Sequence, residues 1–85
     1  MPCLLVYDIP DDRIRTKVSD LCLDYGLDRI QYSAFVGQLN KTYRKELMAR
    51  IRRQVGRKAA KVQLIYVCNE DWAQRIIIEQ EEKRK

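Results

Sequence analysis

Residues 3–9, which read Cys-Leu-Leu-Val-Tyr-Asp-Ile, decide the fold because they form a short and continuous apolar run. Such a run predicts a β-strand that is buried on both faces. A proline and two aspartates follow at residues 10–12, and either aspartate can cap a helix, since its carboxylate accepts hydrogen bonds from the free N–H groups there. Apolar residues then recur at helical spacing up to Gly26, which predicts a helix over residues 12–25.

The middle of the chain repeats this pattern of strand and helix. Residues 29–39 alternate between apolar and polar side chains, which predicts a second strand, long or broken, that can supply a hairpin partner. Asn40 suits the N-cap of a second helix, whose apolar residues keep a four-residue spacing until Gly56 ends it. Residues 61–68 predict a third strand.

The C-terminal part of the chain predicts a turn followed by a short strand. Residues 69–72 are polar apart from one tryptophan and predict the turn, and the β-branched residues within 75–79 favour a strand. The last six residues, 80–85, are charged, and we expect them to fray.

This order of elements favours an α+β fold of the ferredoxin-like type. We expect a βαββαβ sandwich with an antiparallel sheet, two helices on one face and a short C-terminal strand. Residues 1–79 would form a single domain, because a chain of 85 residues is long enough for one small domain only. No third helix covers the other face of the sheet, so a homodimer packed sheet on sheet would bury it.

Composition excludes several classes of function. The chain has no histidine, which excludes histidine-based triads, histidine metal sites and a histidine general base. Its three cysteines match no zinc-binding pattern and are typical of free thiols in a reducing compartment. No apolar run approaches the roughly 20 residues of a membrane span, and no signal peptide is recognisable. We therefore expect a cytoplasmic protein without a membrane partner.

The net charge of +5 is concentrated in one segment. Residues 41–61 hold nine basic residues and one acid, a net charge of +8, whereas the rest of the chain carries −3. This basic segment can bind phosphate backbones, or it can be a solvated helix face that keeps the protein soluble. The arginines that would carry phosphate binding are Arg44, Arg50, Arg52, Arg53 and Arg57.

Asp8 is the candidate residue for chemistry, because it ends the most apolar strand. An ionised aspartate is rarely buried without a partner, which could be an arginine such as Arg13 or Arg15, backbone N–H groups, or a metal. Magnesium prefers oxygen ligands and often takes one or two carboxylates, and hydrolysis without histidine would most simply use such an ion. A dimer that places two Asp8 residues near its twofold axis would offer more ligands than one protomer.

Several motifs in the first half of the chain resemble a known family. They are Tyr-Asp-Ile at residues 7–9, Asp-Asp-Arg at 11–13, Asp-Tyr-Gly-Leu at 24–27 and Arg-Ile-Gln-Tyr-Ser-Ala-Phe-Val-Gly at 29–37. In combination they are similar to the CRISPR-associated protein Two family, the small partner of the CRISPR integrase in spacer acquisition.

The resemblance implies a ferredoxin-like homodimer in which residues 75–79 cross to the partner subunit. Many family members are described as metal-dependent endonucleases that act on RNA or double-stranded DNA. Asp8 would then be the catalytic residue and the ligand of Mg²⁺, or of another divalent cation such as Mn²⁺. The positions that match nucleic-acid-binding or supporting residues of the family are Arg13, Arg15, Arg29, Ser33 and Phe35.

A second function is compatible with the same residues. The dimer would then be a DNA-binding scaffold without chemistry of its own, which bridges integrase dimers through the basic residues 41–61. In both cases the expected partners are a second copy of the chain, the CRISPR integrase, and double-stranded DNA or single-stranded RNA.

Overall fold

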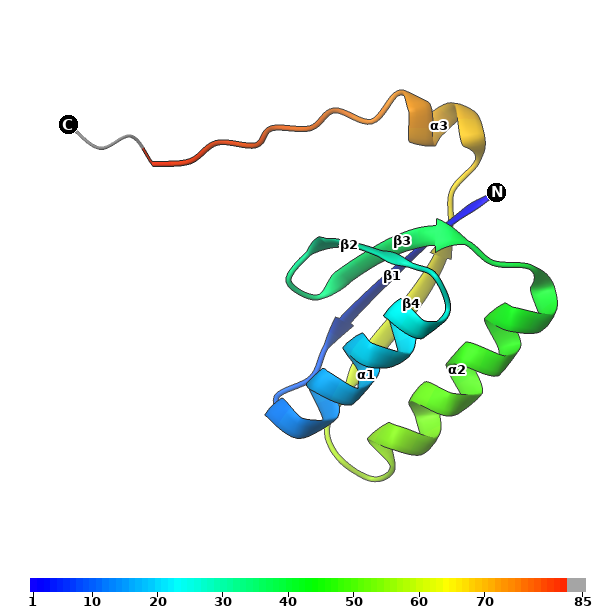
Figure 1. Ribbon diagram of the computed structural model, residues 1–85, viewed down its shortest axis with the longest axis vertical. Coiled ribbons are helices and arrows are strands. Elements are labelled where there is room, and N and C mark those ends of the chain that lie inside the picture. The colour runs from blue at the N-terminus through cyan, green and yellow to red at the C-terminus, as the bar shows by residue number, and fades with distance from the viewer. Residues whose placement is uncertain (83–85) are drawn as a thin grey trace.

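The structure is a computed structural model that describes residues 1–82, which form four strands and three helices (Figure 1). The elements are β1 (Pro2–Asp8), α1 (Asp12–Asp24), β2 (Asp28–Gln31), β3 (Ala34–Gln38), α2 (Lys41–Val55), β4 (Lys61–Tyr66) and α3 (Asn69–Ala73).

The four strands form one sheet in the order β2-β3-β1-β4, and all neighbouring strands are antiparallel. β1 is central and pairs with both β3 and β4, while α1 and α2 lie side by side on one face (Figure 1). This arrangement confirms the predicted ferredoxin-like βαββαβ fold. Neither α1 nor α2 covers the other face (Figure 1).

The core lies between the helices and one face of the sheet. Alternate residues of β1, namely Cys3, Leu5 and Tyr7, are buried there, and Leu5 stands opposite the fully buried Phe35 of β3. Leu4 and Val6 point to the open face and are only half-buried. Burial of the first strand on both faces was therefore a wrong expectation for the single chain, because only one face receives helices.

α1 and α2 begin where the sequence predicts, and they end at or within one residue of the predicted positions. The Ile14 N–H donates a hydrogen bond of 3.0 Å to Oδ1 of Asp11, the N-cap of α1. The Tyr43 N–H donates one of 2.7 Å to Oδ1 of Asn40, the N-cap of α2. Gly56 caps the C-terminus of α2 with a φ of 57°, a left-handed value that favours glycine.

The predicted strand over residues 29–39 is broken into β2 and β3 by a tight turn at Tyr32 and Ser33. The broken form, one of the two that the sequence allows, is the form observed. The turn lies beside β1, because the Tyr7 N–H donates a hydrogen bond of 3.1 Å to the Ser33 carbonyl oxygen. The contact of Ser33 with β1 is thus made by its backbone carbonyl group.

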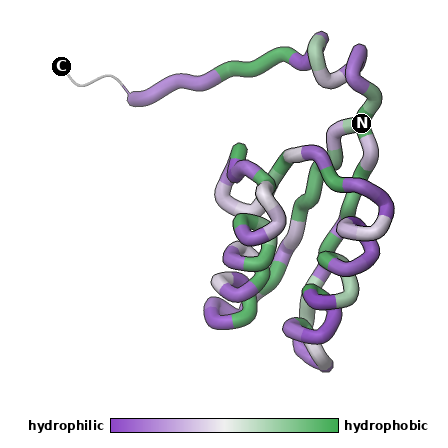
Figure 2. Tube along the Cα trace, turned by 45° about the vertical axis from the view of Figure 1, so that its right-hand side comes forward, coloured by the Kyte–Doolittle hydropathy of each residue, from purple (hydrophilic) through white to green (hydrophobic). Residues whose placement is uncertain are grey.

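The C-terminal part differs from the prediction at three places, the first being that β4 ends at Tyr66 and not at residue 68. Residues 69–72, predicted as a turn, belong to α3, and residues 75–79, predicted as a strand, have no regular secondary structure. Residues 76–78 are three exposed isoleucines, the green stretch of the extended C-terminal segment in Figure 2. A strand needs a neighbour for its N–H and C=O groups, and residues 75–79 pair with no described strand. Residues 80–82 are exposed, and residues 83–85 lie outside the described residues.

Candidate functional site

Asp8 is exposed at the end of β1, on the open face of the sheet. Its register partner on β4 is Lys61, and both residues line a shallow cleft of about 150 Å³. Within residues 1–82 the Asp8 carboxylate makes no hydrogen bond and no ion pair. The expectation that Asp8 is buried is wrong, because the strand alternation that buries Tyr7 turns the next side chain outward.

The described residues contain no group of three His, Cys, Asp or Glu side chains that could hold a metal ion. The free carboxylate of Asp8 suits a hard cation such as Mg²⁺, which often keeps waters and takes only one or two carboxylates. One chain therefore supplies one carboxylate to such a site, and the other ligands would come from a second copy, water or substrate.

Arg15 contacts the loop that follows Asp8. Its Nη1 atom donates a hydrogen bond of 2.9 Å to the Ile9 carbonyl oxygen, and its Nη2 atom pairs with the Asp12 carboxylate. The guanidinium carbon also lies 5.6 Å from the centroid of the Tyr32 ring. The sequence suggested Arg15 as one partner of Asp8, but this ion pair is not observed, because Arg15 pairs with Asp12. Arg13, one of the predicted phosphate ligands, is exposed on the first turn of α1.

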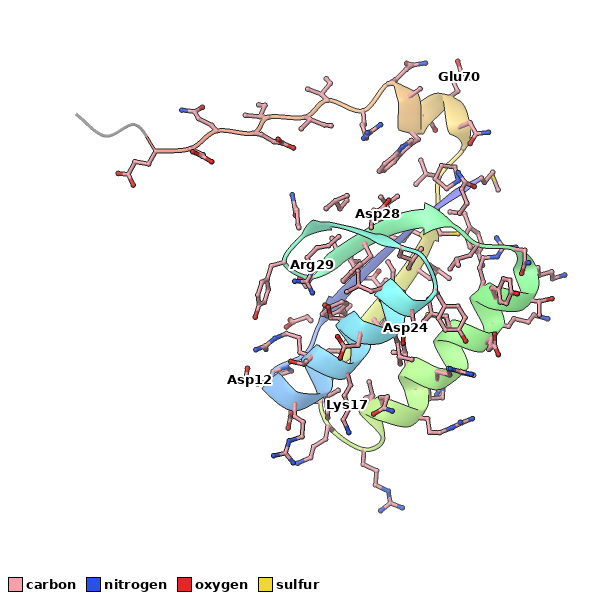
Figure 3. All side chains as sticks on the ribbon, in the orientation of Figure 1. Asp12, Lys17, Asp24, Asp28, Arg29 and Glu70 are labelled. Carbon is pink, nitrogen blue, oxygen red and sulfur yellow. The ribbon has the colours of Figure 1, made fainter. Side chains whose placement is uncertain are left out.

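Arg29 of β2 belongs to a polar cluster between β2 and α1 (Figure 3). It donates a hydrogen bond to Ser19 Oγ, and its guanidinium carbon lies 5.1 Å from the centroid of the Phe35 ring. Phe35 is fully buried and stacks on Tyr7 with ring centroids 6.2 Å apart, so it is a core residue. Burial raises the pKa of the nearby Cys22 thiol to about 12, opposed by the positive charge of Arg29.

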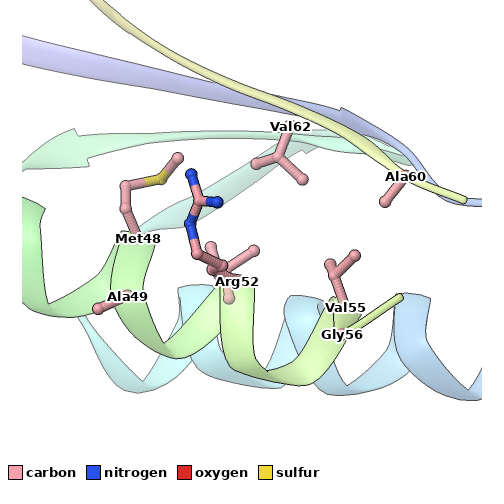
Figure 4. A pocket seen from close by; sticks show the side chains of 8 residues that line it. Met48, Ala49, Arg52, Val55, Gly56, Ala60 and Val62 are labelled. Carbon is pink, nitrogen blue, oxygen red and sulfur yellow. The ribbon is translucent and has the colours of Figure 1, made fainter. Parts of the chain in front are cut away.

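The arginines of the basic segment do not form one uniform face. Arg44 lies over the Tyr66 ring of β4, whereas Arg50 lies over the Tyr25 ring next to α1 and pairs with Glu46 at 3.8 Å. Arg52 lines a cavity of about 440 Å³ between α2 and β4, together with Met48 and Val62 (Figure 4). The remaining two predicted residues, Arg53 and Arg57, are exposed.

Sequence reasoning missed Lys61 as a neighbour of Asp8. The two residues are far apart in the chain, and only the register of β1 against β4 places them opposite each other on the open face. It also missed Tyr66 as the partner of Arg44, for the same reason. No local sequence pattern could have revealed either pair.

These features define a small ferredoxin-like protein with a free carboxylate at the end of its central strand. Residues 1–75 match the family model described as "CRISPR associated protein Cas2". The chain is also 51% identical over 81 residues to a "CRISPR-associated endoribonuclease Cas2 2" of Chloroflexus aurantiacus, covering 95% of both chains. This chain belongs to the Cas2 family.

Two solved structures agree with this chain in fold, and a further relative is similar in sequence. A hypothetical protein from Thermus thermophilus matches with a TM-score of 0.80 and 28% identity, over 93% of this chain and 90% of that one. Streptococcus pyogenes Cas2 matches in fold with a TM-score of 0.77 and 22% identity, over 94% of this chain and 100% of that one. A Cas1/Cas2 fusion of Thermoproteus tenax is 47% identical over 55 residues, which are 65% of this chain and 21% of the fusion.

No helix of residues 1–82 combines the length and the apolar character that a membrane crossing requires.

Proposed function

We propose that this chain acts in CRISPR spacer acquisition as a homodimeric, metal-dependent endonuclease that cleaves the phosphodiester bonds of RNA or double-stranded DNA. The observation that carries the proposal is the Asp8 carboxylate, which stands exposed and unpaired at the end of the central strand. The Chloroflexus aurantiacus relative is named an endoribonuclease, which supports the same activity. A cytoplasmic location remains part of this proposal.

A second copy of the chain is supported by apolar surface that one copy leaves uncovered. The open face carries half-buried apolar side chains from both β1 and β3, namely Leu4, Val6 and Val36. Ile76 and Ile78 are 91% and 85% exposed, and apolar surface of this kind marks interaction sites in soluble proteins. In the dimer, residues 75–79 would pair with a strand of the partner, and the two open faces would bring the two Asp8 residues together.

The roles of the residues follow from their positions. Asp8 of each copy would hold Mg²⁺ or Mn²⁺, which supplies positive charge against the charge that develops on the phosphate during hydrolysis. Lys61 lies opposite Asp8, so its ammonium group adds a positive charge beside the carboxylate. Arg13 is exposed and free to contact a phosphate, while Arg15 holds the Ile9 carbonyl and thereby the loop after Asp8.

A cleavage assay tests the catalytic role. Asp8→Asn keeps the size of the side chain and removes its charge, so we expect loss of cleavage of single-stranded RNA and double-stranded DNA in Mg²⁺. Asp28→Asn is the matched control, because Asp28 is also an exposed aspartate of the sheet. It should leave cleavage unchanged. Full activity of Asp8→Asn, or full wild-type activity in EDTA, would contradict the proposal.

The second candidate function is a DNA-binding scaffold that bridges integrase dimers through residues 41–61. The net charge of +8 in this segment favours it, and the Cas1/Cas2 fusion of Thermoproteus tenax supports an integrase partner. Affinity for duplex DNA should then fall with salt, with a logarithmic slope of about −0.9 per phosphate contacted. If Asp8→Asn preserves spacer acquisition in cells while Arg53→Glu abolishes it, the scaffold is the physiological role.

A further inference from the structure

A cavity separate from Asp8 lies between the first turns of α2 and the end of β4. It has a volume of about 330 Å³ and is lined by Lys41, Arg44, Lys45, Met48, Leu64 and Tyr66. One wall is thus cationic, and the other residues offer apolar or aromatic surface. The volume falls within the range of roughly 300–1,000 Å³ that is typical of small-ligand sites.

The cationic wall is not neutralised by the described part of the protein. Lys41, Arg44 and Lys45 share one face of α2, because residues three or four positions apart are neighbours on a helix. The first turn of α2 contains no acidic residue, and Glu46 pairs instead with Arg50. Like charges this close destabilise a helix, and cations at its N-terminus also oppose the helix dipole. The arrangement therefore favours binding of an anion.

Within this cationic wall, the side chain of Arg44 is held in place by a contact with β4. Its guanidinium carbon lies 4.3 Å from the centroid of the Tyr66 ring, which holds the side chain against β4. Its Nε atom is buried and has no hydrogen-bond acceptor among residues 1–82. A buried donor without an acceptor costs free energy, so a shift of the Arg44 side chain that lets an anion accept from it would stabilise the site.

We propose that this cavity binds a phosphate group of a nucleic acid, with Lys41, Arg44 and Lys45 on the phosphate and the attached nucleoside against Met48, Leu64 and Tyr66. The ligand class rests on the nucleic-acid role of the proposed function. The site itself is distinct, because Asp8 lies opposite Lys61 in the strand register, at the other end of β4. The two ends, Lys61 and Tyr66, are five positions apart along the strand, roughly 17 Å. The cavity anchors the strand and takes no part in hydrolysis.

The test compares two lysines that differ in position and not in charge. Lys45→Gln removes one charge from the cavity, and Lys17→Gln removes one from the exposed surface of α1 (Figure 3). Affinity for a short single-stranded RNA is measured by fluorescence anisotropy at several salt concentrations, in the Asp8→Asn background with EDTA. Arg44→Met, which keeps most of the apolar stem, and Tyr66→Leu complete the set.

We expect Lys45→Gln to weaken binding several-fold and to reduce the logarithmic salt slope by about 0.7, the value for one contact with a single strand. Arg44→Met should weaken it about tenfold, as for the loss of a charged hydrogen bond. Lys17→Gln should stay within about twofold of the parent. Lys45→Gln should unfold at the same or a higher temperature, since like-charge repulsion is relieved. Equal losses in Lys45→Gln and Lys17→Gln would overturn the proposal.

The probes distinguish the source of the phosphate. If removal of the 5′ phosphate of the RNA weakens binding to the parent and not to Lys45→Gln, the cavity takes a terminal phosphate. If the 5′ phosphate has no effect while Lys45→Gln still weakens binding, the cavity takes a backbone phosphate. If a free nucleoside 5′-monophosphate alone shows the dependence on Lys45, the ligand is a free nucleotide and the nucleic-acid assignment falls. Cleavage that persists in Asp8→Asn would contradict the nuclease role and leave the binding results standing.

Discussion

The Arg15 guanidinium donates a hydrogen bond of 2.9 Å to the carbonyl oxygen of Ile9, the residue directly after Asp8. The same side chain pairs with Asp12 and lies over the Tyr32 ring. Arg15 thereby joins the end of β1, the start of α1 and the turn between β2 and β3. Part of its hydrogen-bonding capacity is used within the protein, in a way that positions the loop beside the candidate catalytic carboxylate.

Arg15→Met should separate positioning from nucleic-acid binding. It keeps an aliphatic side chain and removes every donor, so we expect a lower unfolding temperature and a lower kcat for cleavage. Affinity for RNA in the Asp8→Asn background should change little. Arg13→Met is the matched control, because Arg13 is exposed; it should weaken affinity without changing the unfolding temperature. The reverse pattern would show that Arg15 is a direct phosphate ligand.

The three cysteines should differ in reactivity. Burial raises the pKa of Cys22 to about 12, so its thiol stays protonated and unreactive at pH 8, and Cys3 is equally buried. Cys68 is exposed. Mass spectrometry after iodoacetamide treatment should show one modified cysteine in the native protein and three in the denatured protein. Rapid native modification of Cys22 would contradict the packing of α1 on the sheet.

Asp11 should make stability depend on pH in the acid range. The hydrogen bond from the Ile14 N–H holds the pKa of Asp11 below its ordinary value of 3.8. Its contribution to stability is therefore complete above pH 4 and is lost as the pH falls through the lowered pKa of the folded state. Asp11→Asn keeps a cap and cannot titrate. Its unfolding temperature should fall less steeply below pH 4 than that of the wild type.

Gly37→Ala should destabilise the fold. A Cβ atom there would lie 2.6 Å from Leu27 Cδ2 and 3.3 Å from the Leu27 Cα atom, in a well-packed part of the core. Overpacking of this kind costs about 1–3 kcal/mol, measurable by urea denaturation. Leu27→Ala in combination with Gly37→Ala should recover part of the loss due to the glycine change. An unchanged free energy of unfolding in Gly37→Ala would show that Leu27 moves freely.

The exposed isoleucines should decide the oligomeric state. Ile77→Asp places a charge in the segment that would pair with the partner subunit, so we expect the mass measured by light scattering to shift from dimer toward monomer. Gln80→Asp, in the charged stretch beyond, should leave the mass unchanged. A wild-type protein that is monomeric at all concentrations would contradict the dimer.

Local chemistry in the sequence accounts for much of the fold. The apolar run at residues 3–9, the caps at Asp11 and Asn40, and the glycine at Gly56 predict β1, α1 and α2 closely. They do so because caps and periodicity act over a few neighbouring residues. The same local motifs were sufficient to identify the family, which the comparisons confirm.

Contacts between distant segments required the tertiary structure. The exposure of Asp8 follows from which face of the sheet the helices cover, and its position opposite Lys61 follows from the register of β1 against β4. The hydrogen bond from Arg15 to the Ile9 carbonyl depends on how α1 packs, and the contact of Arg44 with the Tyr66 ring depends on how α2 packs. By itself the sequence determined β1, α1 and α2 and the family, since these depend on short-range patterns. Only the assembled sheet decided which charged side chains lie next to one another, such as Asp8 opposite Lys61, because strand register brings together residues that no local pattern relates.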